Sequence, residues 1–454
     1  MCRHRINMPL IMNPKSFIST PLIKNTLKLS SSNFLMYLLP LIVTPILSRL
    51  YVPEAFGEWG VFSSLLMIIN IGIMLGYENA IVKAELKDVA NVSFLCFAVT
   101  VLITILIILT FQIGSYLRID FFKKFPSPSL FYICIITSAA CSIFNNICNR
   151  YEKYAVMSVA NIVSGSTQAI ARILFGTIFI IGMNGLILGT TISHCIVVCY
   201  YLMFIYRIMN NKFLSHISLV GIIHQMKRYK KFPLFDAPSS ILAFAAFNLP
   251  IIILSAYFSK AEIGCFSIII QLLLLPMSFI GSAMGRVYYR QLVGRDEMEI
   301  TSITANVMKL TAVISILPLL FIVLGGDKII VLFLGEKWNT AGSIALCLAL
   351  WSFPTILTQP LIPLLRIRDK MNILFLYNIL YFVGGIGTIL VLVQFTNQLY
   401  LILVLYSIAC SIAKILLFRS ILKLSGVRFN VLHKMLFIWI ISLSILAFRL
   451  SEVL

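Results

Sequence analysis

The sequence predicts an all-α protein that crosses a membrane many times. Of its 454 residues, 60% are hydrophobic and only 11% are charged, whereas about a quarter of the residues in a soluble domain are charged. Apolar runs recur along the chain, each near the ~20 residues that an α-helix needs to cross ~30 Å of hydrocarbon. A transmembrane β-barrel would instead show short segments of alternating hydrophobicity. We therefore expect a polytopic helical membrane protein.

Twelve of these runs form two groups of six, separated by a basic linker at 206–232. A basic segment, 1–29, precedes the first lobe at 30–205, and the second lobe covers 233–421. The remainder, 422–454, holds a basic loop and a thirteenth run, 434–450, which either spans the membrane or lies at its surface. The expected helices are 30–50, 59–80, 91–112, 129–149, 156–181, 185–205, 236–257, 263–284, 304–325, 340–361, 371–393 and 399–420.

The distribution of Lys and Arg predicts the orientation. With a cytoplasmic N-terminus, 25 of the 36 basic residues fall in inner segments and six in outer ones. Basic residues concentrate on the cytoplasmic side of membrane proteins, so the division supports an even number of spans before residue 419. The net charge of +20 therefore reflects membrane orientation. Its placement in short loops argues against nucleic acid as a partner.

An internal repeat connects the two halves. The segment LSRLYVPEAFGEW at 47–59 aligns with LSAYFSKAEIGCF at 254–266 at a constant offset of 207, which matches Leu47 with Leu254 and Gly57 with Gly264. Both copies run through the membrane in the same direction, so the implied axis lies along the membrane normal. A solute path would then lie in a central cavity between two six-helix lobes, near the midplane.

Charged and polar residues inside the spans are the candidates for a substrate site, because a charge at the centre of a membrane helix costs about 2.5–3.5 kcal/mol on insertion scales. Arg172 lies near the middle of its run, and Gln168 shares its helix face four residues away. A guanidinium suits phosphate or carboxylate by planar bidentate pairing. An interhelical contact with a neighbouring helix is an equally good explanation.

Four further charged residues have two interpretations each. Arg49 lines the cavity or reaches the headgroups from the outer end of its helix, while Lys414 lies deep among small residues and is expected to line the cavity or to join helices. Glu78 is a proton carrier or an ion-pair partner of Lys83. Asp236 takes part in ion coupling or caps the seventh helix.

Patterns typical of enzymes and metal sites do not occur. The sequence has no Walker, H-E-x-x-H or G-x-S-x-G motif. Most of its ten cysteines lie inside apolar runs, where cysteine behaves as a small hydrophobe. We therefore expect no catalytic residue, no metal site and no cofactor. A proton or sodium gradient would be the energy source.

Several segments resemble the Wzx-type flippases of O-antigen and other bacterial polysaccharide repeat units, members of the multidrug/oligosaccharidyl-lipid/polysaccharide (MOP) exporter superfamily. In the second half these are FPLFDAPSSILAFAAFNLPIIILSAYFSKAEIGCFSI, LLLLPMSFIGSAMGRVYY and VLFLGEKWNTAGSIALCLALW. In the first half they are TPILSRLYVPEAFGEWGVF and YENAIV. Together they extend from about residue 40 to 360. The apparent thirteenth span departs from a plain twelve-helix plan.

The resemblance implies a function in surface polysaccharide and lipopolysaccharide biosynthesis. The expected substrate is an undecaprenyl-diphosphate-linked oligosaccharide, moved across the bacterial inner membrane by alternating access. Arg49 and Arg172 would bind the diphosphate or acidic sugars. The expected partners besides the bilayer are a polysaccharide polymerase and a chain-length regulator.

Two other functions stay open at this point. A drug or metabolite exporter of the same superfamily would carry a carboxylate in its spans for exchange with a cationic drug. A membrane glycan polymerase or ligase would carry a large outer loop, whereas the longest outer loops expected here have about fifteen residues.

Overall fold

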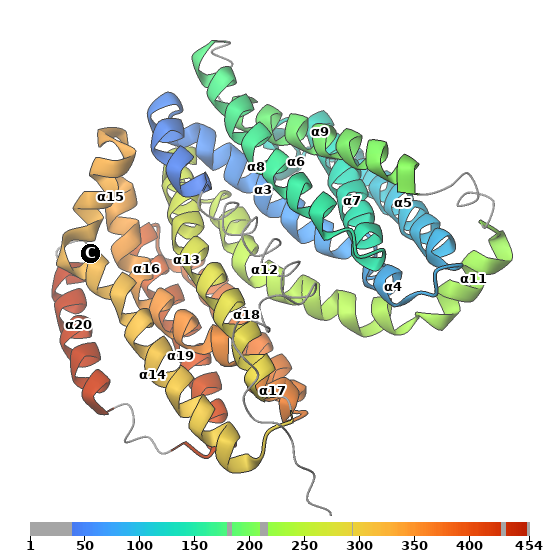
Figure 1. The fold of residues 1–454 in the computed structure, drawn as a ribbon. Helices are drawn as coiled ribbons and strands as arrows, with labels where there is room; N and C mark the ends of the chain where they lie inside the picture. Colours follow the sequence, from blue (N-terminus) through green and yellow to red (C-terminus); the bar gives the residue numbers. More distant parts are fainter. Residues whose placement is uncertain (1–38, 179–183, 209–216, 293, 428–432, 452–454) are drawn as a thin grey trace, which may run out of the picture.

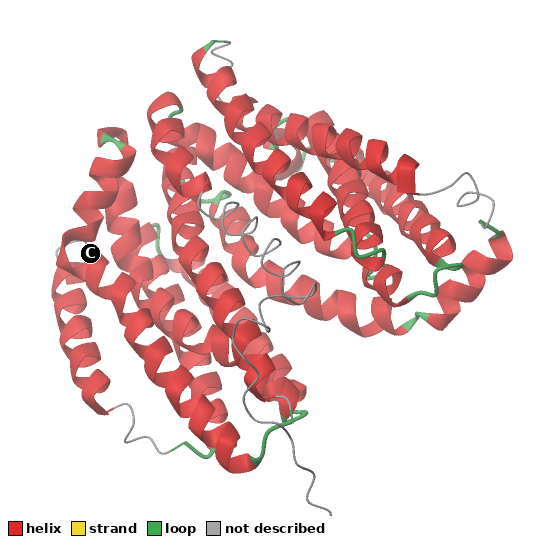
Figure 2. Cartoon of the chain, in the orientation of Figure 1, coloured by secondary structure: helices red, strands yellow, loops and turns green. Residues whose placement is uncertain are grey.

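The computed structural model describes residues 39–178, 184–208, 217–292, 294–427 and 433–451. Over these residues the chain is helical and contains no strand (Figure 2). Nine of the described helices are long and apolar enough to cross a membrane. The predicted class, an all-α polytopic membrane protein, is therefore confirmed. The segment 1–29 and the start of the run 30–50 lie outside the described residues.

The first lobe contains seven labelled helices after the short apolar helix Leu39–Leu50. They are α3 (Pro53–Gly72), α4 (Glu78–Lys83), α5 (Val89–Tyr116), α6 (Asp120–Lys124), α7 (Pro128–Arg150), α8 (Tyr154–Thr177) and α9 (Asn184–Ile208). Helix α11 (Leu219–Arg228) follows in the linker. Arg228 forms ion pairs with Glu85 and Asp88, so α11 is held against the loop between α4 and α5.

The second lobe begins with a π-turn, η1 (Phe232–Asp236), that runs directly into α12 (Ala237–Leu254). The elements that follow are α13 (Lys260–Leu292), α14 (Glu297–Phe321), η2 (Ile322–Gly326), α15 (Asp327–Leu334), η3 (Glu336–Trp338), α16 (Asn339–Thr358), η4 (Gln359–Leu361), α17 (Pro363–Ile367), α18 (Met371–Phe395), α19 (Leu399–Ser425) and α20 (His433–Ser451). Helix α16 lies at the centre of this lobe, because nearly every residue from Ala341 to Thr358 is buried.

Two helix ends differ from the predicted boundaries for local reasons. The run expected to begin at residue 59 begins at Pro53, where proline fits the first helical position and Glu54 favours the helix dipole. The same helix ends at Gly72 and not near residue 80, since Leu75 and Gly76 adopt positive φ angles before α4 starts. The charged residues between Pro53 and residue 59 made the helix start too late in the prediction. The turn at Leu75 and Gly76 ends the helix before the apolar run ends.

The two lobes meet along a seam between α3 and the helices α12 and α13 (Figure 1). They lie against each other where α3 and α13 begin, which we call the closed end, and diverge toward α4 and α17 at the opposite, open end. The backbones at the closed end are very close. A Cβ atom on Gly57 would lie 2.1 Å from the carbonyl oxygen of Lys260, and one on Gly264 would lie 1.8 Å from that of Pro53.

The contact between Gly57 and Gly264 has a symmetry consequence. These two glycines are equivalent in the repeat, and a Cβ on Gly57 would lie 3.3 Å from the amide nitrogen of Gly264. Equivalent residues of two copies touch only near the axis that relates them. The seam therefore agrees with an axis that passes between the lobes at the closed end.

Polar bonds across the seam hold the closed end together. The Lys260 ammonium lies 2.6 Å from the Glu58 carboxylate. The Ser48 hydroxyl donates to the carbonyl oxygen of Leu334 at 2.7 Å, and the Trp338 indole donates to the carbonyl oxygen of Ser48 at 2.9 Å. The two bonds at Ser48 are buried, so water does not compete with them.

Candidate substrate-binding site

Arg172 is buried inside the first lobe, on the face of α8 that contacts α9. Its Nη2 donates to the Thr190 hydroxyl at 2.8 Å, and its Nε donates to the carbonyl oxygen of Leu186 at 3.3 Å. The guanidinium carbon lies 4.7 Å from the ring centroid of Trp59 on α3. Uncharged acceptors and an aromatic face therefore hold this cation, and it forms no ion pair with a described carboxylate. The contacts match the interhelical explanation, and binding of substrate stays a prediction.

Lys414 is the corresponding buried cation of the second lobe, on α19. Its ammonium lies 4.7 Å from the ring centroid of Tyr381 on α18. The Tyr381 hydroxyl accepts a bond of 2.7 Å from the Trp351 indole, and its ring lies 5.5 Å from that of Phe247 on α12. Within the described chain Lys414 has no carboxylate in ion-pair range either. Among the described side chains, each lobe thus contains a buried cation on an aromatic ring.

Arg49 lies at the closed end and is exposed, with its Cγ 4.0 Å from where a Cβ on Gly335 would be. Two residues further on, the Tyr51 hydroxyl donates to the backbone carbonyl of Arg172 at 2.6 Å. The hydrogen bond from Tyr51 links the segment that carries Arg49 to the helix that carries Arg172. The two side chains lie in different environments, since Arg49 is exposed and Arg172 is buried. The exposed position agrees with a side chain that reaches the headgroup region.

Glu78 and Asp236 lie at the open end. Glu78 does not form the ion pair with Lys83, and Asp236 does not form the helix cap; each was one of two interpretations of the sequence. Lys83 does not pair with Glu78. Its ammonium instead lies 5.0 Å above the ring of Phe232. One carboxylate oxygen of Glu78 is buried, with no hydrogen-bond partner among the described residues. Glu78 is therefore the better candidate for an ion-coupling group, which remains a prediction.

Asp236 does not cap α12. The π-turn runs directly into the helix, so Asp236 itself has helical backbone angles, and Pro238 at the second helical position has no N–H to donate to the carboxylate. Asp236 instead accepts a bond of 2.9 Å from the Asn79 amide of the first lobe. It also lines a basic pocket of about 540 Å³ at the open end. The lining residues are Lys83, Arg228, Tyr229, Lys231, Phe232, Phe235, Asp236 and Ser239.

Gln168 belongs to a polar stripe on α8, which it shares with Asn161, Ser164 and Arg172. The opposite face of the helix exposes apolar side chains, among them Ile162. This arrangement explains why α8, with 24 residues, is not among the nine described helices that are apolar enough to be identified as spans. The apolar face suits lipid, and the polar stripe faces the interior of the lobe.

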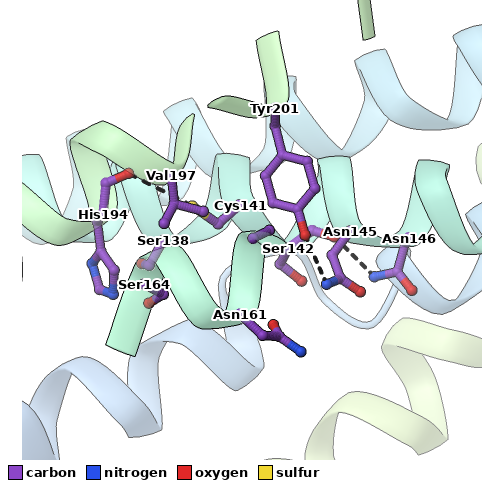
Figure 3. A pocket seen from close by; sticks show the side chains of 11 residues that line it. Ser138, Cys141, Ser142, Asn145, Asn146, Asn161, Ser164, His194, Val197 and Tyr201 are labelled. Carbon is purple, nitrogen blue, oxygen red and sulfur yellow. Dashed lines mark hydrogen bonds between the residues drawn. The ribbon is translucent and has the colours of Figure 1, made fainter. Parts of the chain in front are cut away.

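A polar pocket of about 250 Å³ lies beside this stripe, between α7, α8 and α9. Figure 3 shows the side chains of the three helices converging on it, with His194 and Ser164 on one side and Asn145 and Tyr201 on the other. The lining residues are Ser138, Cys141, Ser142, Asn145, Asn146, Ala160, Asn161, Ser164, His194, Val197 and Tyr201. Sequence reasoning missed most of them. The amide cluster in FNNICNR, inside an apolar run, was the available signal.

Electrostatics outside the spans are conventional. Glu85, in the loop between α4 and α5, lies beside Lys87 at 3.1 Å and Arg228 at 3.4 Å. Bonds from Lys87 first, and then from Arg228, lower the pKa of its carboxyl group. The carboxylate therefore stays charged down to a lower pH than usual and keeps the linker helix against the first lobe.

Comparison of this helical architecture with solved structures defines its class. The chain resembles an inward-facing multidrug resistance MATE family transporter of the MOP superfamily, with a TM-score of 0.67 and 15% identity over 86% of this chain and 94% of that one. It also resembles the lipid II flippase MurJ in an inward closed conformation, with a TM-score of 0.69 and 14% identity over 94% and 98%. A third match is a MOP superfamily transporter from Pyrococcus furiosus Vc1, with a TM-score of 0.59 and 14% identity over 89% and 95%. The fold is that of the MOP transporters.

The family follows from a sequence model. Residues 46–343, more than half of the chain, match the family described as polysaccharide biosynthesis protein. The chain therefore belongs to the polysaccharide biosynthesis protein family. None of the curated proteins matches it significantly. The family match, together with the MOP fold, confirms the resemblance to Wzx-type flippases, and the nine apolar helices of the described residues identify a multi-pass membrane protein.

Proposed function

We propose that the protein transfers an undecaprenyl-diphosphate-linked oligosaccharide repeat unit from the cytoplasmic to the periplasmic leaflet of a bacterial inner membrane. The family is one of polysaccharide biosynthesis, and MurJ, a lipid II flippase, shares the fold. O-antigen or a related surface polysaccharide would be the final product. The protein would act as a transporter and not as a catalytic enzyme.

The observation that carries this proposal is the sign of the charges buried in the two lobes. Arg172 and Lys414 are both buried, and neither has an ion-pair partner among the described residues. A fixed positive charge inside a membrane protein favours an anionic solute such as a diphosphate. A cationic drug would be repelled by it. The fold alone does not distinguish a drug exporter from a glycan flippase, because MATE transporters share it. The positive sign of the buried charges favours a lipid-linked glycan over a cationic drug.

The closed and open ends suggest how transport would proceed. The seam at Gly57 and Gly264 closes one end, while the lobes diverge at the other. The positive-inside distribution assigns the open end to the cytoplasm. A lipid-linked substrate would enter there, and opening of the seam would release it on the other side. A proton or sodium gradient acting through Glu78 would drive the cycle, since one oxygen of its carboxylate is buried without a partner in the described structure.

Deletion of the gene in its native host tests the proposal. Undecaprenyl-linked repeat units should accumulate, and polymer should disappear from the cell surface. Complementation with Arg172→Ala, at equal membrane abundance, should restore at most about a tenth of the wild-type export, because a charge-assisted contact contributes roughly 1.5–3 kcal/mol. Complementation with Thr137→Val, which changes a half-buried residue on α7 away from Arg172 and Lys414, is the control and should restore export fully.

Two outcomes would contradict the proposal. Finished polymer accumulating inside the deletion strain would place the protein after polymerisation. Unchanged levels of both species would remove the protein from this process altogether.

A further inference from the structure

We infer that the polar pocket between α7, α8 and α9 is a subsite for one uncharged sugar of the glycan, separate from the cations that would meet the diphosphate. The inference rests on the proposed function and adds residues and a ligand class to it. The pocket is built entirely within the first lobe, from three neighbouring helices.

The chemistry of the lining is the first argument. Eight of the eleven residues that line the pocket present hydroxyl, amide, imidazole or phenol groups, the other three are Cys141, Ala160 and Val197, and none is Lys, Arg, Asp or Glu. Such a surface offers many hydrogen-bond donors and acceptors but no charge. It therefore suits the hydroxyl and acetamido groups of a sugar. A phosphate would require a cation, and a cationic drug would require a carboxylate.

An unused hydrogen-bonding atom is the second argument. The Nδ1 atom of His194 is buried and has no partner in the described structure. Buried polar atoms in native proteins are nearly always bonded to protein, water or ligand. In Figure 3 the imidazole ring lies near Ser138 and Ser164, on one side of the pocket. Because this atom is not exposed in the pocket, a bound hydroxyl group would become its partner on rotation of the imidazole ring.

Other polar groups are already oriented by the protein. The Asn145 amide donates to the Tyr201 hydroxyl at 3.0 Å, which leaves the amide oxygen to accept from a ligand. The Asn146 amide donates to the carbonyl oxygen of Ser142 at 3.0 Å. Groups fixed by such bonds lose little conformational entropy on binding. The pocket is therefore preorganised for a polar ligand.

Size and position agree with one sugar unit. A volume of about 250 Å³ is below the roughly 300–1,000 Å³ of sites for drug-sized ligands. Ser138 at the pocket also donates to the side-chain oxygen of Asn70 on α3 at 2.7 Å. Helix α3 forms the seam with the second lobe, so the pocket is joined directly to the helix that contacts both lobes.

Binding of two lipid probes to the purified full-length protein in nanodiscs tests the inference. The probes are undecaprenyl diphosphate and the same lipid carrying one N-acetylglucosamine. The variant Asn145→Leu/Tyr201→Phe removes both members of a hydrogen-bonded pair and keeps their approximate shape, so the fold should tolerate it. Thr137→Val is the matched control, because this half-buried residue lies on the same helix as Asn145 and does not line the pocket.

Wild type should bind the glycosylated probe more tightly than the bare lipid. The double variant should weaken binding of the glycosylated probe by about 5- to 30-fold and leave binding of the bare lipid unchanged. The control should bind both probes as wild type does. If the double variant is poorly folded by size-exclusion chromatography, Ser142→Ala replaces it, with an expected loss of about 3-fold for the glycosylated probe alone.

The contrary outcomes separate the two proposals. Equal effects on both probes, no effect on either, or wild-type binding that does not depend on the sugar would overturn the sugar subsite and leave the flippase proposal in place. Wild type that binds neither probe would overturn the proposed function, and the subsite with it.

Discussion

Gly264 provides a direct test of the seam between the lobes. A methyl group at this position would lie 1.8 Å from the carbonyl oxygen of Pro53, whereas a carbon–oxygen contact normally requires about 3.3 Å. Gly264→Ala should therefore push α3 and α13 apart by roughly 1.5 Å at the closed end. The obstructing atom belongs to backbone, so no side-chain rotation can relieve the contact.

The expected effect can be placed on an energy scale. Overpacking of a tight contact costs typically about 1–3 kcal/mol. In a protein that alternates between two conformations, this amount changes their ratio by roughly 5- to 150-fold. The conformation in which the closed end is sealed should lose that population, and the conformation open at this end should gain it.

The assay uses the residues that form the ion pair across the seam. With Glu58→Cys and Lys260→Cys present, a short bifunctional thiol reagent should cross-link the closed end, because the native carboxylate and ammonium are 2.6 Å apart. Adding Gly264→Ala should lower the cross-linked fraction strongly. Adding Gly384→Ala should leave it unchanged, since a Cβ there would have nothing within 4 Å. Equal cross-linking in both variants would refute the close backbone contact.

Two further predictions concern charged groups. Lys414→Met should raise the melting temperature by the equivalent of about 1–3 kcal/mol. The reason is that a buried ammonium without an ion-pair partner among the described residues is replaced by an apolar side chain of similar length. Glycan export by the same variant should fall. A lower melting temperature, measured in detergent with wild type alongside, would show that the contact with Tyr381 is structural instead. The contact of the linker helix with the first lobe should weaken on acidification, because the pKa of Glu85 is lowered in the folded protein. The stability that the charged Glu85 carboxylate gives to this contact is fully present above the unfolded pKa of about 4.3 and is lost as the pH falls through the folded pKa. The protection factors of the amides at 219–228, which are corrected for the intrinsic slowing of exchange at low pH, should fall on acidification. Protection factors that rise on acidification would contradict the prediction.

The sequence predicted the spans well but their ends less well. The runs expected at 371–393 and 399–420 correspond to α18 at Met371–Phe395 and α19 at Leu399–Ser425. The length and hydropathy of an apolar run are properties of the local sequence, so the span that it forms can be predicted without knowledge of tertiary contacts. The loop expected at 326–340 contains the helix α15, because apolar residues there continue the helical pattern beyond Gly325.

The candidate site was predicted less completely than the spans. Arg172 and Lys414, which the sequence places inside apolar runs, are both buried, and their binding of substrate stays a prediction. Two of the alternatives considered, an ion pair of Glu78 with Lys83 and a cap of the seventh helix by Asp236, do not form in the described structure, because a turn after α3 and a π-turn before α12 place these side chains elsewhere. Such backbone irregularities leave almost no trace in composition.

The sequence by itself determined a helical membrane protein with two related halves, positive segments on one side and a few costly polar residues inside its spans. These conclusions need only the energy of placing each residue in hydrocarbon, which is a property of the residue and its neighbours along the chain. The tertiary structure decided which of these residues meet. It placed Gly57 against Gly264, gave Arg172 its partners on α9 and brought Asn145 to Tyr201. Those contacts depend on how each helix is rotated and packed against the others, and hydropathy does not determine rotation.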